Sequence, residues 1–478
     1  MSADAARIAG AFAALGLAVL IAARPRAARL AGLGTWAIGG ILLAFYLAPA
    51  SHQRVLVAAA VVGVALAVGL AFVFRRWPWA LAAAALACVP ARIPVSVGGT
   101  EANLLVPLYA VVAGAALLLA WELLRGPPRA RELGPLAWPL AAYVAWTGMS
   151  LLWSGDPHQG AIAVFFFYLP FGLLAVSLAR LPWNPRLLAW LFAELVAMAV
   201  VFAAIGVYQW ATRDIFWNPK VIVGNAYAPF FRVNSVFYDP SVYGRFLVVA
   251  IAACLVVVLY SKSPRVAYAA AGAIAAAWIG LLFSFSQSSF AALAAVALLL
   301  AALAWRWRAA LAIALVALVV IAAGVSAPRI RSSFVKHSHS GLNHATSGRW
   351  KLVTNGIKLA AHHPVAGVGI GDFKHAYAKQ VGLRGREPSG AASHDTPVTV
   401  AAELGLPGLA LLAWLVTTIV LLTLRRVSTS VAGRTVLICG VALTAIAVHS
   451  LFYNAFFEDP TTWGLLGLAA LAARVKEA

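Results

Sequence analysis

The sequence predicts an all-α, polytopic membrane protein: a bundle of about 12–15 transmembrane helices with two long external loops. Three observations support this class. The 478 residues are 63% hydrophobic and only 11% charged, whereas soluble domains carry roughly 25% charged residues. Apolar runs such as residues 55–74 reach the length of about 20 residues that crosses a bilayer, and they recur along the whole chain. The segments between them alternate between basic and non-basic, as expected for a multi-pass protein.

The apolar runs place the expected helices in order along the chain. We predict spans at 8–23, 30–50, 55–74, 77–91, 103–124, 135–153, 161–180, 187–210, 246–260, 266–283, 290–304, 309–326, 409–424, 435–457 and 462–474. Because further spans follow the first apolar run, we expect no cleavable signal peptide.

The connecting segments set the expected orientation. Basic connectors such as "RPRAAR" and "RLPWNPR" should be cytoplasmic, and connectors such as "SGDPHQG" and "EDPTT" should lie outside. The sequence therefore predicts five regions: N-terminal spans 1–210, an external loop 211–245, spans 246–326, a large external loop with a polar motif 327–408, and C-terminal spans 409–478.

The larger external loop is unusually basic. Residues 327–395 hold ten Lys and Arg against three Asp and Glu, a net charge of +7. This excess on the outer face indicates an anionic ligand; the alternative is that the side chains reach lipid phosphates. No aromatic RNA-binding motif or basic tail accompanies the overall charge of +21, so we expect no nucleic-acid partner.

Within this loop, residues 348–364 have helical periodicity. Trp350, Val353, Ile357 and Ala360 fall on one face, which predicts an amphipathic helix at the outer interface, ended by Pro364. The stretch "GVGIGDF" (367–373) then predicts a glycine-rich turn.

His394 stands where a helix is expected to begin. Asp395 or Thr396 can cap that helix, Pro397 suits its first turn, and "GLPG" (405–408) should break it. The positive field of a helix N-terminus disfavours imidazolium and attracts anions. A neutral histidine is what a general base requires; the alternative is a histidine that only caps or hydrogen-bonds.

Nothing in the sequence predicts a metal site or a cofactor. Cys88, Cys254 and Cys439 are far apart within apolar runs, and we interpret them as small buried side chains. The pair of histidines in "HSHS" (337–340) is too few for a metal site.

The polar motifs resemble those of bacterial O-antigen ligases. His394-Asp395, nine residues, and Gly405-Leu-Pro-Gly408 are similar to that family's histidine motif, although Asp395 departs from it. "SGRW" (347–350), "HHPVAGVGIGDF" (362–373) and "FFRVNSVFYDPSVYGRFL" (230–247) resemble the wider family. In "SFSQSSF" the chain has Gln287 where the family commonly has arginine.

The resemblance implies a metal-independent, inverting glycosyltransferase of the bacterial inner membrane whose active site faces outward. It implies an undecaprenyl-pyrophosphate-linked glycan as donor, with His394 as general base. Arginines suit the pyrophosphate, and we assign Arg232 and Arg349 to it, with Arg245 and Lys336 as further contacts. Glu403 and Asp395 are candidates for the acceptor.

Several alternatives stay open. The arginines can instead anchor to lipid phosphates or pair within the loops, and Glu403 can be part of a structural ion pair. The acceptor can be a lipid A core sugar, a growing lipid-linked glycan as in an O-antigen or exopolysaccharide polymerase, or a protein hydroxyl. A different class is a lipid-linked glycan flippase. Transporters place ionisable residues at the midplane, whereas here the polar residues gather in outer loops.

Overall fold

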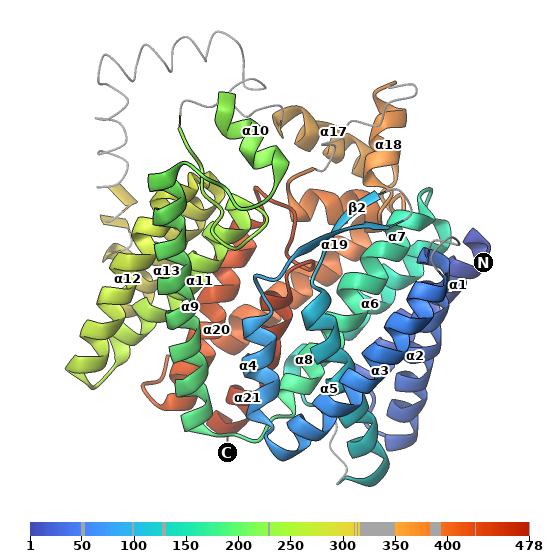
Figure 1. Cartoon of the computed structure of the whole chain (residues 1–478), viewed down its shortest axis with the longest axis horizontal. Coiled ribbons are helices and arrows are strands. Elements are labelled where there is room, and N and C mark those ends of the chain that lie inside the picture. Colours follow the sequence, from blue (N-terminus) through green and yellow to red (C-terminus); the bar gives the residue numbers. More distant parts are fainter. Residues whose placement is uncertain are drawn as a thin grey trace.

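The computed structural model describes residues 1–48, 53–97, 100–126, 131–227, 230–309, 311–312, 314–315, 349–382, 393–425 and 427–477. In these residues ten helical segments are long and apolar enough to cross a membrane. They are α1 (Ala3–Ala22), α2 (Arg26–Leu47), α5 (Val106–Arg125), the run Pro157–Ala179, α9 (Pro185–Thr212), α11 (Pro240–Tyr260), α12 (Pro264–Ser284), α13 (Gln287–Trp305), α19 (Thr396–Thr423) and α20 (Val431–His449). The predicted all-α, polytopic bundle is confirmed (Figure 1).

The run Pro157–Ala179 comprises α7 (Pro157–Ala163), the π-helical turn η4 (Val164–Tyr168) and α8 (Leu169–Ala179). The other helices are α3 (Gln53–Arg76), α4 (Trp79–Ala87), η2 (Gly134–Leu136), α6 (Ala137–Ser150), η3 (Leu151–Trp153), α10 (Pro219–Tyr227), α17 (Arg349–His362), α18 (Phe373–Gln380) and α21 (Pro460–Glu477). The predicted span 77–91 is thus a shorter helix than expected, whereas η2, α6 and η3 together cover the predicted span 135–153. Most of the predicted span 309–326 lies outside the described residues.

A short β-hairpin follows α4, and the sequence analysis did not predict it. Strands β1 (Ile93–Val97) and β2 (Thr100–Leu104) pair antiparallel, with Ile93 opposite Leu104. The signal was present as "IPVSV" and "TEANL" around a Gly-Gly pair, because β-branched residues flanking two glycines favour a hairpin.

Small residues allow the first two helices to pack closely. A Cβ atom on Gly16 of α1 would lie 2.6 Å from the carbonyl oxygen of Gly32 of α2, and one on Gly39 would lie 2.6 Å from that of Ala9. Backbones at this distance pack by van der Waals contact, which drives helix association inside lipid.

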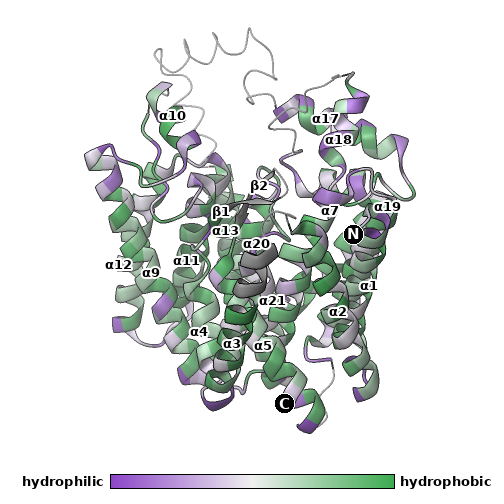
Figure 2. Ribbon diagram, turned by 45° about the vertical axis from the view of Figure 1, so that its right-hand side comes forward, coloured by the Kyte–Doolittle hydropathy of each residue, from purple (hydrophilic) through white to green (hydrophobic). Residues whose placement is uncertain are grey.

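The buried apolar side chains form two main clusters. The larger joins α1, α5, α6, α8, α19 and α21, and includes the fully buried Trp463. The second joins α9, α11, α12, α13 and α20. Figure 2 shows hydrophobic residues along the middle of the bundle and hydrophilic residues mainly at its two ends, including α10, α17 and α18 at one of them.

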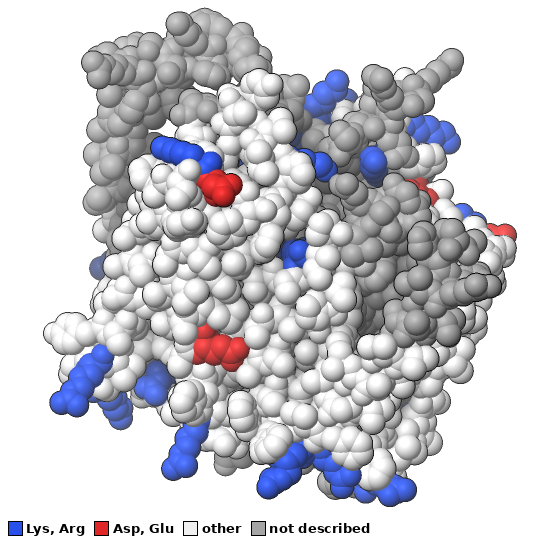
Figure 3. Space-filling model, in the orientation of Figure 1, with Lys and Arg blue, Asp and Glu red and all other residues white. Residues whose placement is uncertain are grey.

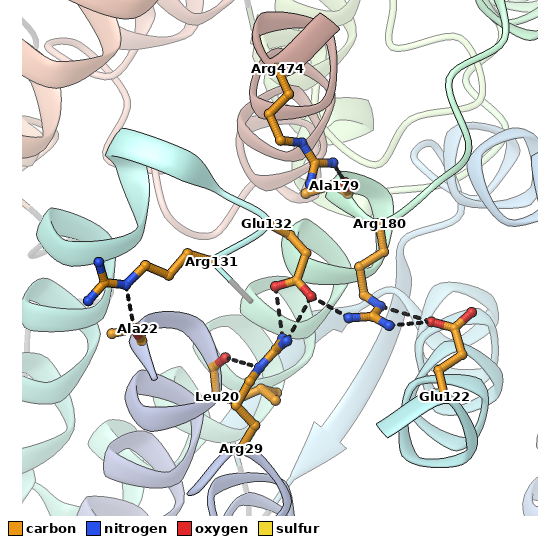
Figure 4. Close-up of polar contacts among 9 residues, drawn as sticks. All are labelled: Leu20, Ala22, Arg29, Glu122, Arg131, Glu132, Ala179, Arg180 and Arg474. Atoms are coloured by element: carbon orange, nitrogen blue, oxygen red, sulfur yellow. Dashed lines mark hydrogen bonds and ion pairs between the residues drawn. The ribbon is translucent and has the colours of Figure 1, made fainter. Parts of the chain in front are cut away.

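An ion network connects the helices at the end of the bundle opposite α10, α17 and α18 (Figure 4). Both guanidinium nitrogens Nη1 and Nη2 of Arg29 donate to the Glu132 carboxylate at 2.8 Å, and Arg180 also pairs with Glu132. Arg180 further pairs with Glu122 at 2.7 Å. Arg29 and Glu132 are 0% and 2% exposed, so the network fastens α2, α5 and α8 to the segment before η2.

Candidate functional site

His394 lies directly before the N-terminus of α19, as predicted. The N-cap is Asp395, whose Oδ1 accepts a hydrogen bond from the Val398 amide at 2.8 Å. The Thr396 amide donates to the Ser450 carbonyl oxygen at 3.0 Å, and its hydroxyl donates to Asn454 Oδ1 at 2.8 Å. His394 itself has a left-handed backbone, with φ of 55°. These bonds fix the start of α19 and hold the half-buried histidine in place.

The predicted break in α19 occurs at Gly405, which has φ of 68° and ψ of −169°. A residue with a side chain rarely adopts this conformation. Pro407 contributes because it has no amide hydrogen for the carbonyl of Glu403. The break divides the segment into a short helix that follows His394 and a longer span.

The glycine-rich loop supplies the hydrogen bonds that the broken helix lacks. The Val368 amide donates to the Ala402 carbonyl oxygen and the Gly369 amide to that of Glu403, both at 2.9 Å, while the Leu406 amide donates to the carbonyl oxygen of Pro364 at 2.7 Å. Gly369 has φ of 96°. This confirms the turn expected at "GVGIGDF" and attaches it to the helix that follows His394.

Helix α17 confirms the helix predicted over residues 348–364. Trp350 and Ile357 of the predicted apolar face are 51% and 55% exposed, while Gly356 and Leu359 are buried. A Cβ atom on Gly356 would lie 2.6 Å from Val398 Cγ1 of α19, so the absent side chain lets the two helices touch, which hydrophobic periodicity alone does not reveal.

Three of the predicted site residues come together at this end. Arg349 is the first residue of α17, and its positive charge acts on both His394 and Arg232. Burial lowers the pKa of His394 below its ordinary value, and the positive charge of Arg349 lowers it further. Burial and the charge of Arg349 therefore both favour the neutral imidazole that the sequence predicts. Figure 3 shows Lys and Arg side chains gathered over α17 and α18.

Arg232 is fixed in the segment that precedes α11. Its backbone exchanges two hydrogen bonds with the Asn225 side chain, at 2.9 and 3.0 Å, and its Nε donates to the Ser284 carbonyl oxygen at 3.2 Å. Burial lowers the pKa of Arg232, Asp239 opposes that shift, and Arg349 adds to it. The exposed Gln287 begins α13 three residues beyond Ser284, on the chain segment that Arg232 contacts.

Arg245 has a buried partner that the sequence analysis missed. It is 2% exposed and pairs with Asp459 at 2.7 Å. Burial would raise the pKa of Asp459, but Arg245 and Arg92 outweigh it and hold that pKa below its ordinary value. Burial raises the pKa of the adjacent Glu458, and the same two arginines oppose the shift. No spacing in the sequence connects residues 92, 245 and 459.

An apolar cavity of about 170 Å³ opens beside this ion pair. It lies between α4, α8, α9, α11, α20 and α21, and is lined mostly by aliphatic and aromatic side chains with Arg92, Arg245 and Asp459 among them. The cavity therefore combines a long hydrocarbon wall with a charged region.

A second cavity of about 170 Å³ has both polar and apolar lining residues and shares a wall with the helix that follows His394. Its lining includes Thr396, Thr399 and Glu403 of α19, and Asn454 and Glu458 of the segment before α21. The Phe373 amide donates to Glu403 Oε1 at 3.3 Å, so Glu403 is oriented by the glycine-rich loop.

Lys336 and the stretch 337–340 lie outside the described residues. Asp239 is the N-cap of α11. Among the residues that the structure describes, no group of three His, Cys, Asp or Glu side chains is arranged to hold a metal ion.

Fold and site together define a polytopic helical membrane protein with a histidine and arginines gathered at one end of its bundle. Residues 272–413 match the family model described as O-antigen ligase, so this part of the chain is similar to that family. The matched segment contains Arg349 and His394, while Arg232 and Arg245 precede it. A comparison with curated proteins found no match. The family match supports a membrane glycosyltransferase of the O-antigen ligase or polymerase type.

Proposed function

We propose that the protein transfers a glycan from undecaprenyl pyrophosphate to an acceptor hydroxyl at the outer face of the bacterial inner membrane. His394 takes the proton of the acceptor hydroxyl. The acceptor oxygen then bonds to the anomeric carbon, and the bond from that carbon to the pyrophosphate oxygen breaks with inversion. Undecaprenyl pyrophosphate leaves with the electron pair. The main support is the lowered pKa of the half-buried His394, which burial and then the positive charge of Arg349 both favour.

The donor's charge is best matched by Arg232 and Arg349. Both lie at the end that carries His394, and their mutual electrostatic repulsion favours an anion between them. Arg245 is the weaker candidate, because it already neutralises Asp459. The apolar cavity beside that ion pair supports binding of a polyprenyl chain, since its wall is hydrocarbon and its charged region can face a headgroup.

The acceptor is best matched by the second cavity, next to α19. Glu403, Thr399 and Asn454 offer acceptor and donor atoms for sugar hydroxyls. We therefore keep Glu403 as the acceptor-orienting residue. Asp395 already uses one carboxylate oxygen to cap α19, so its part would be to hold the helix that follows His394.

The same chemistry serves a ligase, which acts on a lipid A core sugar, and a polymerase, which acts on a lipid-linked glycan. We favour the ligase because the family model that matches the chain carries that description. The proposed reaction needs no metal and no cofactor, because the arginines carry the charge of the leaving group.

The test is a transfer assay with purified protein, an undecaprenyl-pyrophosphate glycan and a panel of acceptors. His394→Ala should lower the transfer rate by about 100-fold to 10,000-fold, with donor affinity near normal. His394→Gln should not recover activity, since an amide cannot accept the proton. The matched control is His363→Ala, which removes an exposed histidine of the same region. A His394→Ala protein that transfers glycan at the parental rate would refute the mechanism and favour a transporter.

A further inference from the structure

A third cavity lies at the end of the bundle opposite His394. It has a volume of about 610 Å³ and is enclosed by α3, α4, α5 and the end of α8. Its apolar wall includes Phe74, Leu81, Leu118 and Leu119, and its polar part includes arginines and one glutamate. None of these residues takes part in the proposed transfer reaction.

Two exposed arginines of this cavity share one aromatic ring. The guanidinium carbon of Arg75 lies 4.9 Å from the centre of the Trp121 ring, and that of Arg125 lies 4.3 Å from it. Two cations on one indole repel each other, so the arrangement favours an anion that bridges them. Within the described ranges, neither Arg75 nor Arg125 makes an ion pair with a carboxylate.

The third arginine of the cavity is already neutralised. Arg180 pairs with Glu122 and Glu132 in the buried network of Figure 4. Glu122 is the acid of the lining, and this pairing offsets its negative charge. The charge available to a ligand therefore comes from Arg75 and Arg125.

A buried hydroxyl group also lines the cavity. Ser177 of α8 is 7% exposed, and its Oγ atom has no hydrogen-bond partner. A buried hydroxyl without a partner is costly, so a ligand oxygen at this position would satisfy it.

From these features we propose that the cavity binds one anionic phospholipid. The phosphodiester bridges Arg75 and Arg125, a headgroup or ester oxygen bonds to Ser177, and an acyl chain covers the apolar wall formed by α3, α4 and α5. The apolar wall distinguishes this ligand from a free phosphate, which would gain nothing from it. The ligand would connect α3 and α5 to α8 next to the ion network.

The experiment measures lipid binding to the purified full-length protein in neutral detergent at 150 mM salt. The probes are dioleoyl phosphatidylglycerol, dioleoyl phosphatidylcholine and inorganic phosphate. Binding is measured by native mass spectrometry or by a fluorescence titration. Phosphatidylglycerol should bind at least tenfold more tightly than phosphatidylcholine, and millimolar phosphate should not displace it. Arg75→Gln and Arg125→Gln should each weaken phosphatidylglycerol binding about tenfold, because each removes a charge-assisted contact.

The matched control is Arg76→Gln. Arg76 has the same charge on the same helix end, lies near Trp77 rather than Trp121, and does not line the cavity. Its loss should weaken binding less than threefold, since long-range attraction is screened at this salt concentration. The proposal fails if Arg76→Gln has the same effect as Arg75→Gln, if the two lipids bind equally, or if phosphate displaces the lipid. The arginines are exposed, so these variants should fold; a normal elution profile checks this. Glycan transfer does not enter the readout.

Discussion

Replacing Gly405 by alanine should damage both the stability of the protein and the placement of His394. At φ of 68° and ψ of −169°, an alanine would occupy a region of backbone conformation that is essentially restricted to glycine, at a cost of about 1–3 kcal/mol. The new Cβ atom would also lie 2.6 Å from the Val365 carbonyl oxygen and 2.8 Å from that of Pro364. These are main-chain atoms that cannot rotate away.

The two effects together predict a destabilisation of about 2–4 kcal/mol, within the range of severe single substitutions. Relief of the clash requires the loop at Pro364 and the helix after His394 to separate. A displacement of about 1 Å at a catalytic group can cost about 100-fold in rate. We therefore expect the Gly405→Ala protein to lose most of its transfer activity even at temperatures where it stays folded.

The assay compares thermal unfolding in detergent with the rate of glycan transfer. Gly272→Ala is the matched control, because a Cβ atom on Gly272 of α12 meets no atom within 4 Å and alanine favours a helix by about 1 kcal/mol. The control should be as stable as the parent or more so, and fully active. If Gly405→Ala unfolds at the same temperature as Gly272→Ala and transfers glycan equally well, the break does not position the histidine.

Other predictions concern charge. Arg349→Ala should move the acidic limb of the pH–rate profile to higher pH. His394 acts as a base only when neutral, and Arg349 helps to hold its pKa below the ordinary value. Loss of that cation therefore raises the pKa of His394. An unchanged pH profile would contradict this. Arg232→Ala should weaken donor use by about 1.5–3 kcal/mol with acceptor use unchanged, and Arg232→Lys should recover only part of it; normal donor kinetics in both variants would make Arg232 an interfacial anchor. Glu132→Gln should destabilise the fold by about 3–5 kcal/mol, because it removes the carboxylate charge from the buried pair with Arg29, and thermal unfolding measures this. Cysteine at the exposed Lys358 position should react with an impermeant reagent in intact spheroplasts; labelling only after lysis would reverse the proposed orientation.

The features that could be predicted from the sequence are local ones. Asp395 as N-cap and the break at Gly405 each depend on two or three neighbouring residues whose backbone preferences are strong. The all-α bundle was predictable because long apolar runs have few alternatives in a membrane.

The features that were missed depend on contacts distant in sequence. Arg245 pairs with Asp459, more than 200 positions away, and no local pattern selects that partner among the acids. The contact between α17 and α19 depends on the absent side chain of Gly356 next to Val398. Hydrophobic periodicity does not identify a glycine as a contact residue. Lys336 stays a prediction.

The hydrogen bonds around Gly405 limit how the protein can be recombined. The carbonyls of Ala402 and Glu403 receive their donors from Val368 and Gly369, and Pro364 accepts from Leu406. A chimera that joins the loop of one relative to the helix of another must reproduce all three main-chain contacts at once. Swaps with crossovers between residues 370 and 400 should therefore yield unstable proteins, whereas exchange of a single block from the start of α17 to beyond Gly408 preserves the unit. Acceptor preference can then be altered by exchanging this whole block.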